Sequence, residues 1–82
     1  MTGTIMNDSR LKEIQRAQRL IGEAKGILEL AAAQEQDDLD KMPQDLQNSD
    51  AGERAEDAVD ALERAAVSCD DAISACEEAI QR

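Results

Sequence analysis

The carboxylate side chains are the first candidates for chemistry in this sequence. The 82 residues include 19 Asp and Glu against 9 Lys and Arg, which gives a net charge of −10, and they include no His, Phe, Tyr or Trp. Paired carboxylates act as general acid and base where an apolar pocket raises one pKa. Here the carboxylates fall on the polar positions of helical patterns, and His, the commonest general base, is absent. We therefore predict a protein that is not an enzyme and uses no cofactor.

The two cysteines are the second candidates. Cys69 and Cys76 are seven residues apart in a helical pattern, so about 10 Å of helix axis separates them. A disulfide requires Cα atoms within about 7 Å, so the two cannot bridge each other. Without His or a Cys-x-x-Cys pair, the sequence predicts no metal site. We expect buried thiols in a reducing compartment, with a disulfide between two copies as the alternative.

The acidic residues concentrate between residues 35 and 60, where only Lys41 and Arg54 oppose them and the net charge is −8. Carboxylates are favourable where a helix begins and unfavourable where it ends. This leaves two interpretations: a solvated surface that serves solubility, or an acidic tip that binds a partner. The candidate partner-binding residues are Glu35, Asp37, Asp38, Asp40, Asp45, Asp50, Glu53, Glu56, Asp57 and Asp60.

Two long helices position these carboxylates. Apolar residues at helical spacing predict a first helix over about 9–41 and a second over about 51–81. Pro43 disfavours helical geometry at the residue before it, so we expect a turn over about 42–50. The predicted fold is all-α, a single domain over residues 1–82 that forms an antiparallel helical hairpin.

The expected helix starts follow from capping chemistry. After a leader of residues 1–7, Asp8 or Ser9 is expected to cap the first helix by accepting a bond from a free backbone N–H. Asp50 with Glu53 three residues later predicts a capping box at the start of the second helix.

The predicted contact between the helices is rich in alanine, which allows close approach. Gly22 and Gly26 lie inside the first helix and mark either close approach of a partner backbone or a weak point of the helix. Because the apolar stripe is wider than one seam can cover, we expect two hairpins to pair into a four-helix bundle. The predicted seam comprises Ile14, Ala17, Ile21, Ala24, Leu28, Ala31, Ala58, Val59, Leu62, Ala65, Cys69, Ala72, Ile73, Cys76, Ala79 and Ile80.

Opposite charges are expected to favour the antiparallel register. The basic start of the first helix would lie beside the acidic end of the second. The residues involved are Arg10, Lys12, Arg16 and Arg19 on the first helix, and Asp70, Asp71, Glu77 and Glu78 on the second.

The segment around the turn resembles a pattern found in small helical-hairpin proteins of bacteriophages, plasmids and other mobile elements. In that pattern, a Met-Pro-x-x-Leu-Gln-x-Ser turn precedes an acidic helix with alanine-rich heptads. The matching residues are Met42, Pro43, Leu46, Gln47, Ser49, Gly52, Glu53, Glu56, Ala58, Leu62, Glu63 and Ala65. An aromatic residue that often stands a few positions before the proline is absent here, and Leu39 is the nearest apolar candidate for that position. The resemblance implies a mobile-element setting and a hairpin.

The charge and composition limit the partners. A net charge of −10 disfavours direct binding to nucleic acid, and no segment has the apolar length of a membrane span. No signal peptide is recognisable, so we expect a cytoplasmic protein, in the host cytosol if a phage encodes it. The favoured function is an acidic interaction module that forms a homodimer and binds a basic host nucleic-acid-binding or defence protein, as DNA-mimicking anti-CRISPR and antirestriction inhibitors do. The alternative is a purely structural coiled-coil assembly protein.

Overall fold

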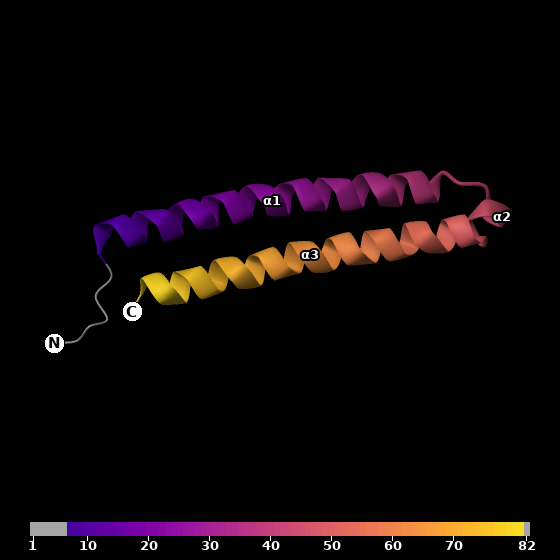
Figure 1. The fold of residues 1–82 in the computed structure, drawn as a ribbon. Helices are drawn as coiled ribbons and strands as arrows, with labels where there is room; N and C mark the ends of the chain where they lie inside the picture. The colour runs from indigo at the N-terminus through magenta and orange to yellow at the C-terminus, as the bar shows by residue number, and fades with distance from the viewer. Residues whose placement is uncertain (1–6, 82) are drawn as a thin grey trace.

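The chain forms an all-α hairpin of two long helices (Figure 1). The computed structural model describes residues 7–81, so most of the expected leader lies outside the described residues. Helix α1 covers Asp8–Asp40, the short helix α2 covers Gln44–Gln47, and helix α3 covers Asp50–Ile80. The hairpin is a rod of 66 × 17 × 13 Å.

Helix α1 begins one residue earlier than the sequence suggested. Its N-cap is Asn7, whose Oδ1 accepts a hydrogen bond from the Arg10 backbone N–H at 2.7 Å. Neither Asp8 nor Ser9 is the cap, since both already belong to the helix. Asn is among the best N-cap residues because its side-chain oxygen satisfies a donor that has no partner in the helix.

The connection at 42–50 is more ordered than a simple turn. Pro43 occupies the N-cap position of the one-turn helix α2. Because α2 has only four residues, the spacing of apolar residues could not predict it. The Gln47 side chain reaches back and donates from Nε2 to the carbonyl oxygens of Leu39 (3.1 Å) and Met42 (2.9 Å). Because the last carbonyls of a helix have no partner within it, Gln47 ties α2 to the end of α1.

The start of α3 packs tightly against α2. Ser49 is the N-cap, and its hydroxyl donates to the Leu46 carbonyl oxygen instead of accepting from α3. The expected capping box at Asp50 is therefore not formed, because Asp50 is already the first residue of the helix. Gly52 is buried against the Gln47 backbone, where no side chain has room.

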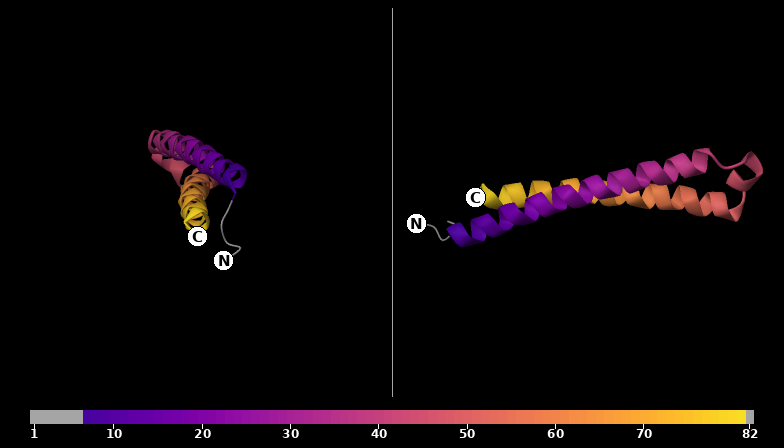
Figure 2. Two further views of the ribbon diagram at one scale, coloured as in Figure 1. Left: turned by 90° about the vertical axis from the view of Figure 1, so that its left-hand side faces the viewer. Right: turned by 90° about the horizontal axis from the view of Figure 1, so that it is seen from above.

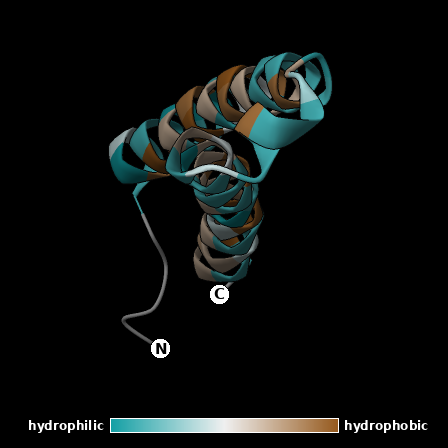
Figure 3. Cartoon of the chain, turned by 90° about the vertical axis from the view of Figure 1, so that its right-hand side faces the viewer, coloured by the Kyte–Doolittle hydropathy of each residue, from teal (hydrophilic) through white to brown (hydrophobic). Residues whose placement is uncertain are grey.

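The two long helices cross at a shallow angle, as Figure 2 shows in two further views. The buried apolar residues belong mainly to the half of the rod near the turn: Ala32, Leu39, Ala55, Val59 and Ala66. Towards the termini the facing residues are half-buried. Apolar segments (brown) alternate with polar ones (teal) along both helices (Figure 3). The turn end is thus the better-packed end of the hairpin.

Candidate functional site

The hairpin brings the predicted acidic residues to one end of the rod. Those of α1 lie in its last turns and those of α3 in its first three turns, with Asp45 between them in α2. All ten are exposed except Glu35, which is half-buried on the side of α1 that faces α3. The turn therefore assembles a cluster of exposed carboxylates, called here the acidic tip, from the ten residues predicted above.

Few of these carboxylates are neutralised locally. Lys41 Nζ lies 2.7 Å from Asp37, and Arg64 Nε lies 3.0 Å from Asp60. Asp40 accepts a hydrogen bond from Gln36 Nε2 at 2.8 Å. Among the described residues, the other tip carboxylates form no ion pair, so they carry their charge into solvent.

The structure places fifteen of the sixteen predicted seam residues at least partly out of solvent. Val59 is buried and Ala24 is exposed, while the other fourteen are half-buried. Ala24 lies outside the contact because Lys25, the next residue, takes the inward position. The predicted seam omitted Ala32, Leu39, Ala55 and Ala66, which are among the most buried residues of the chain.

Two polar residues of α1 occupy positions that face α3, and their contacts fix the register of the two helices. Lys25 Nζ lies 2.8 Å from Asp70 on α3 and 3.8 Å from Glu29. Gln18 Nε2 donates to the Ile73 carbonyl (3.3 Å) and to Glu77 Oε1 (3.1 Å). The predicted attraction between the basic start of α1 and the acidic end of α3 forms no ion pair among the described residues. The one described ion pair that joins the two helices is Lys25–Asp70, near the middle of α1.

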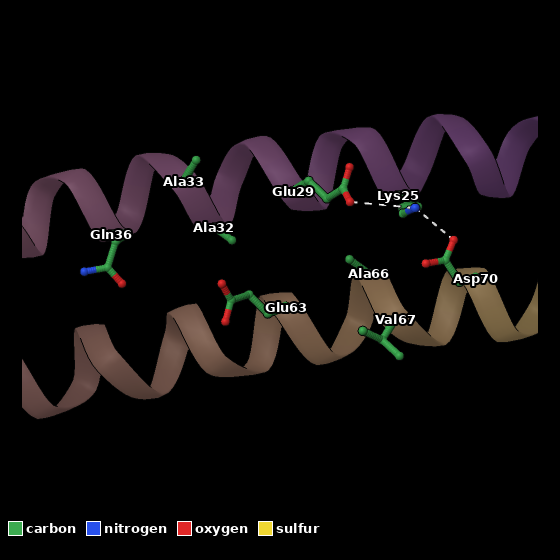
Figure 4. A pocket seen from close by; sticks show the side chains of 9 residues that line it. All are labelled: Lys25, Glu29, Ala32, Ala33, Gln36, Glu63, Ala66, Val67 and Asp70. Atoms are coloured by element: carbon green, nitrogen blue, oxygen red, sulfur yellow. Dashed lines mark ion pairs between the residues drawn. The ribbon is translucent and has the colours of Figure 1, made fainter.

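A groove of about 490 Å³ lies beside this ion pair. Ala32 and Ala66 point into the space between the two helices, whereas Ala33 and Val67 point away from the opposite helix (Figure 4). The lining residues are Lys25, Glu29, Ala32, Ala33, Gln36, Glu63, Ala66, Val67 and Asp70. The groove thus lies on one side of the hairpin.

The Lys25–Asp70 pair predicts a loss of stability at alkaline pH. The hydrogen bond to Asp70, together with the charges of Asp70 and Glu29, raises the pKa of the Lys25 ammonium above its ordinary value. Because the folded state favours the protonated lysine, this stabilisation is present below about pH 10.4 and disappears as the pH rises through the raised pKa. We expect the melting temperature to fall between pH 9.5 and 11.5 more steeply in the native chain than in Lys25→Met.

Lys12→Met is the matched control, because Lys12 is exposed and forms no described ion pair. Thermal melts followed by circular dichroism across this pH range make the measurement. Equal alkaline slopes for the native chain and Lys25→Met would contradict the assignment of a stabilising role to the pair.

Within residues 7–81, no three Cys, Asp or Glu side chains are grouped so as to hold a metal ion. None of the helices in the described part of the chain is long and apolar enough to cross a bilayer. Cys69 and Cys76 are both free thiols. The chain matches no protein-family model, no curated protein and no solved structure.

Proposed function

We propose that the protein is a non-enzymatic, cytosolic interaction module whose acidic tip binds a basic nucleic-acid-binding protein. By occupying a surface that otherwise holds DNA, it would inhibit that partner in the manner of a DNA mimic. The concentration of exposed carboxylates at the turn is the observation that carries this proposal. The mobile-element pattern that the turn resembles is consistent with an inhibitor of a host defence protein.

The charge density of the acidic tip supports mimicry. Between residues 50 and 60, α3 rises only about 15 Å, so with the turn the net charge of −8 falls within roughly 20–25 Å. Duplex DNA carries about one charge per 1.7 Å of axis, and the tip carries about one net charge per 3 Å. A surface of this density favours fast encounter with a basic groove.

The packing of the hairpin supports a rigid tip. The buried residues Leu39, Ala55 and Val59 lie directly behind the carboxylates, and Gln47 holds α2 against the end of α1. A surface that is ordered before binding loses less conformational entropy on association. The tip is thus better suited to recognition than the half-buried end at the termini.

A pull-down from bacterial lysate tests the proposal. The tagged full chain is washed in parallel at 50 and 500 mM salt, and bound proteins are identified by mass spectrometry. We expect a basic nucleic-acid-binding protein that is retained at low salt, is lost at high salt because the charges are screened, and is displaced by added duplex DNA. Binding that resists both salt and DNA would contradict mimicry.

Matched variants localise the binding surface. Changing Asp50, Glu53, Glu56 and Asp57 to the corresponding amides removes four exposed charges from the tip without removing side-chain volume. We expect at least a tenfold loss of affinity for the captured protein. The control removes four charges far from the tip, at Asp8, Asp71, Glu77 and Glu78, and should reduce affinity much less. Equal losses would indicate a general charge effect instead of a tip.

The exposed apolar residues favour a second function, that of a self-assembling structural protein. Leu20, Ile27 and Leu30 are 50%, 68% and 59% exposed, respectively. In a two-helix hairpin with few buried residues, such side chains favour association with a second copy, which would give a homodimeric four-helix bundle. Self-association is compatible with an acidic tip and is tested separately below.

A further inference from the structure

The side of α1 that turns away from the groove carries large exposed apolar residues. Ile27 is two residues from both Lys25 and Glu29, which line the groove. Two residues correspond to about 200° around a helix of 3.6 residues per turn, so Ile27 lies on the opposite side. Leu20, one heptad earlier, shares this side. Both side chains are at least half exposed.

Beside Leu20 and Ile27, a neighbouring column of residues on α1 begins with a positive charge and ends with a negative one. Residues spaced by seven form a column of five: Arg10, Ala17, Ala24, Ala31 and Asp38. Ala24 is the midpoint of the helix Asp8–Asp40. Arg10 and Asp38 are both exposed and neither forms an ion pair among the described residues. A second α1 running in the opposite direction would place each arginine opposite an aspartate.

We propose that two copies of the hairpin pair antiparallel along this face of α1, about a two-fold axis near Ala24. Leu20 and Ile27 straddle that axis, so Leu20 of each copy packs against Ile27 of the other. The small side chain of Ala24, between Leu20 and Ile27, permits helix approach at the near end of the usual 8–10 Å range. Arg10 and Asp38 form an ion pair with the opposite copy at each end of the contact. This inference deepens the proposed self-association and is independent of any partner of the acidic tip.

Helix α3 leaves room for this contact. The Lys25–Asp70 pair places the middle of α1 beside residue 70 of α3. Ser68 and Ala72 are each two residues from Asp70, so they too turn away from the groove. Both are small, so neither position of α3 presents a large side chain to a second hairpin.

The antiparallel arrangement also separates the acidic tips. Each tip carries a net charge of −8, and a parallel pair would bring both tips to the same end of the bundle. Because like charges at short range repel, the antiparallel pair is electrostatically preferred. Apart from Asp38, which pairs with Arg10 of the other copy, it leaves both tips free at opposite ends of the dimer.

Sedimentation equilibrium of the full chain over a concentration series tests the contact. We expect a dimer for the native chain, and at least a hundredfold weaker dimer for the double variant Leu20→Glu/Ile27→Glu. Val67→Glu is the matched control, because Val67 is equally exposed but lines the groove, and its dimer should persist. Circular dichroism verifies that each variant keeps its helices.

Charge reversal tests the orientation. Arg10→Asp and Asp38→Arg should each weaken the dimer several-fold, and the two combined in one chain should restore it, since the opposite charges then meet again. A dimer that survives Leu20→Glu/Ile27→Glu would overturn the proposed face while leaving self-association intact. Failure of the combined reversal to restore the dimer would overturn the antiparallel orientation. A native chain that stays monomeric would overturn both the inference and self-association, whereas the acidic tip is tested by the pull-down alone.

Discussion

Gly52→Ala is expected to destabilise the hairpin by about 1–3 kcal/mol, the usual cost of forcing an extra group into a packed site. A Cβ at residue 52 would lie 2.7 Å from the Gln47 Cα and closer still to the Gln47 carbonyl group. These are backbone atoms, so no side-chain rotation can make room. The end of α2 must therefore move away from α3, which also strains the Gln47 hydrogen bonds to the end of α1.

Gly26→Ala is the matched control, and it should stabilise the hairpin. A Cβ at residue 26 would meet nothing within 4 Å, and Ala is preferred over Gly inside a helix by about 1 kcal/mol. The expected changes in melting temperature are a fall of roughly 5–20 °C for Gly52→Ala and a rise of roughly 4–8 °C for Gly26→Ala. Thermal melts of both variants measure this, and a rise for Gly52→Ala would show that α2 does not pack against α3 as described.

The glycines differ in how far the sequence alone predicts their surroundings in the fold. Because glycine is costly inside a helix, the sequence indicated either a close backbone contact or a weak point at Gly22 and Gly26. In the hairpin both face open space. Gly52 lies near a helix start, where glycine is unremarkable, and its role depends on α2, a helix of four residues. A segment of one turn has no periodicity, so the close contact at Gly52 could not be predicted from the pattern.

The two long helices were predictable because their apolar residues recur over about 30 residues, and Pro43 marked the break between them. The residues that face inward were harder to assign. Gln18 and Lys25 occupy inward positions on α1, so a search for apolar residues shifted the predicted seam towards Ala17 and Ala24. The partner of Lys25 is Asp70, 45 residues along the chain, and only the register of the folded hairpin brings the two together.

The acidic tip was predictable as a cluster because the turn necessarily joins the end of α1 to the start of α3. Its relation to the core was not predictable. The buried residues gather at the turn end, while the half of the rod near the termini combines half-buried apolar side chains with the polar contacts of Gln18 and Lys25. Damage to the core near the turn should therefore affect the tip and the whole hairpin together.

Val59→Asp is expected to unfold the hairpin. Val59 is 7% exposed and packs in the best-buried part of the contact. The change loses about 1.5–3 kcal/mol of apolar burial, and an unpaired charge in a buried site costs several kcal/mol more. A chain of this length has a total stability of about 4–12 kcal/mol, and a hairpin with so few buried residues lies at the low end of that range. Circular dichroism at 25 °C should show most of the helical signal lost.

Val67→Asp makes the same chemical change eight residues further along α3, where the side chain is 58% exposed. The new carboxylate stays in water there, and the nearby Glu63, Asp70 and Asp71 each add a repulsion of a few tenths of a kcal/mol, about 1 kcal/mol together. The melting temperature should therefore fall by less than about 10 °C, and the chain should stay folded at 25 °C. If both variants melted alike, the contact at Val59 would contribute little, and the acidic tip would lack the rigid support that its proposed role requires.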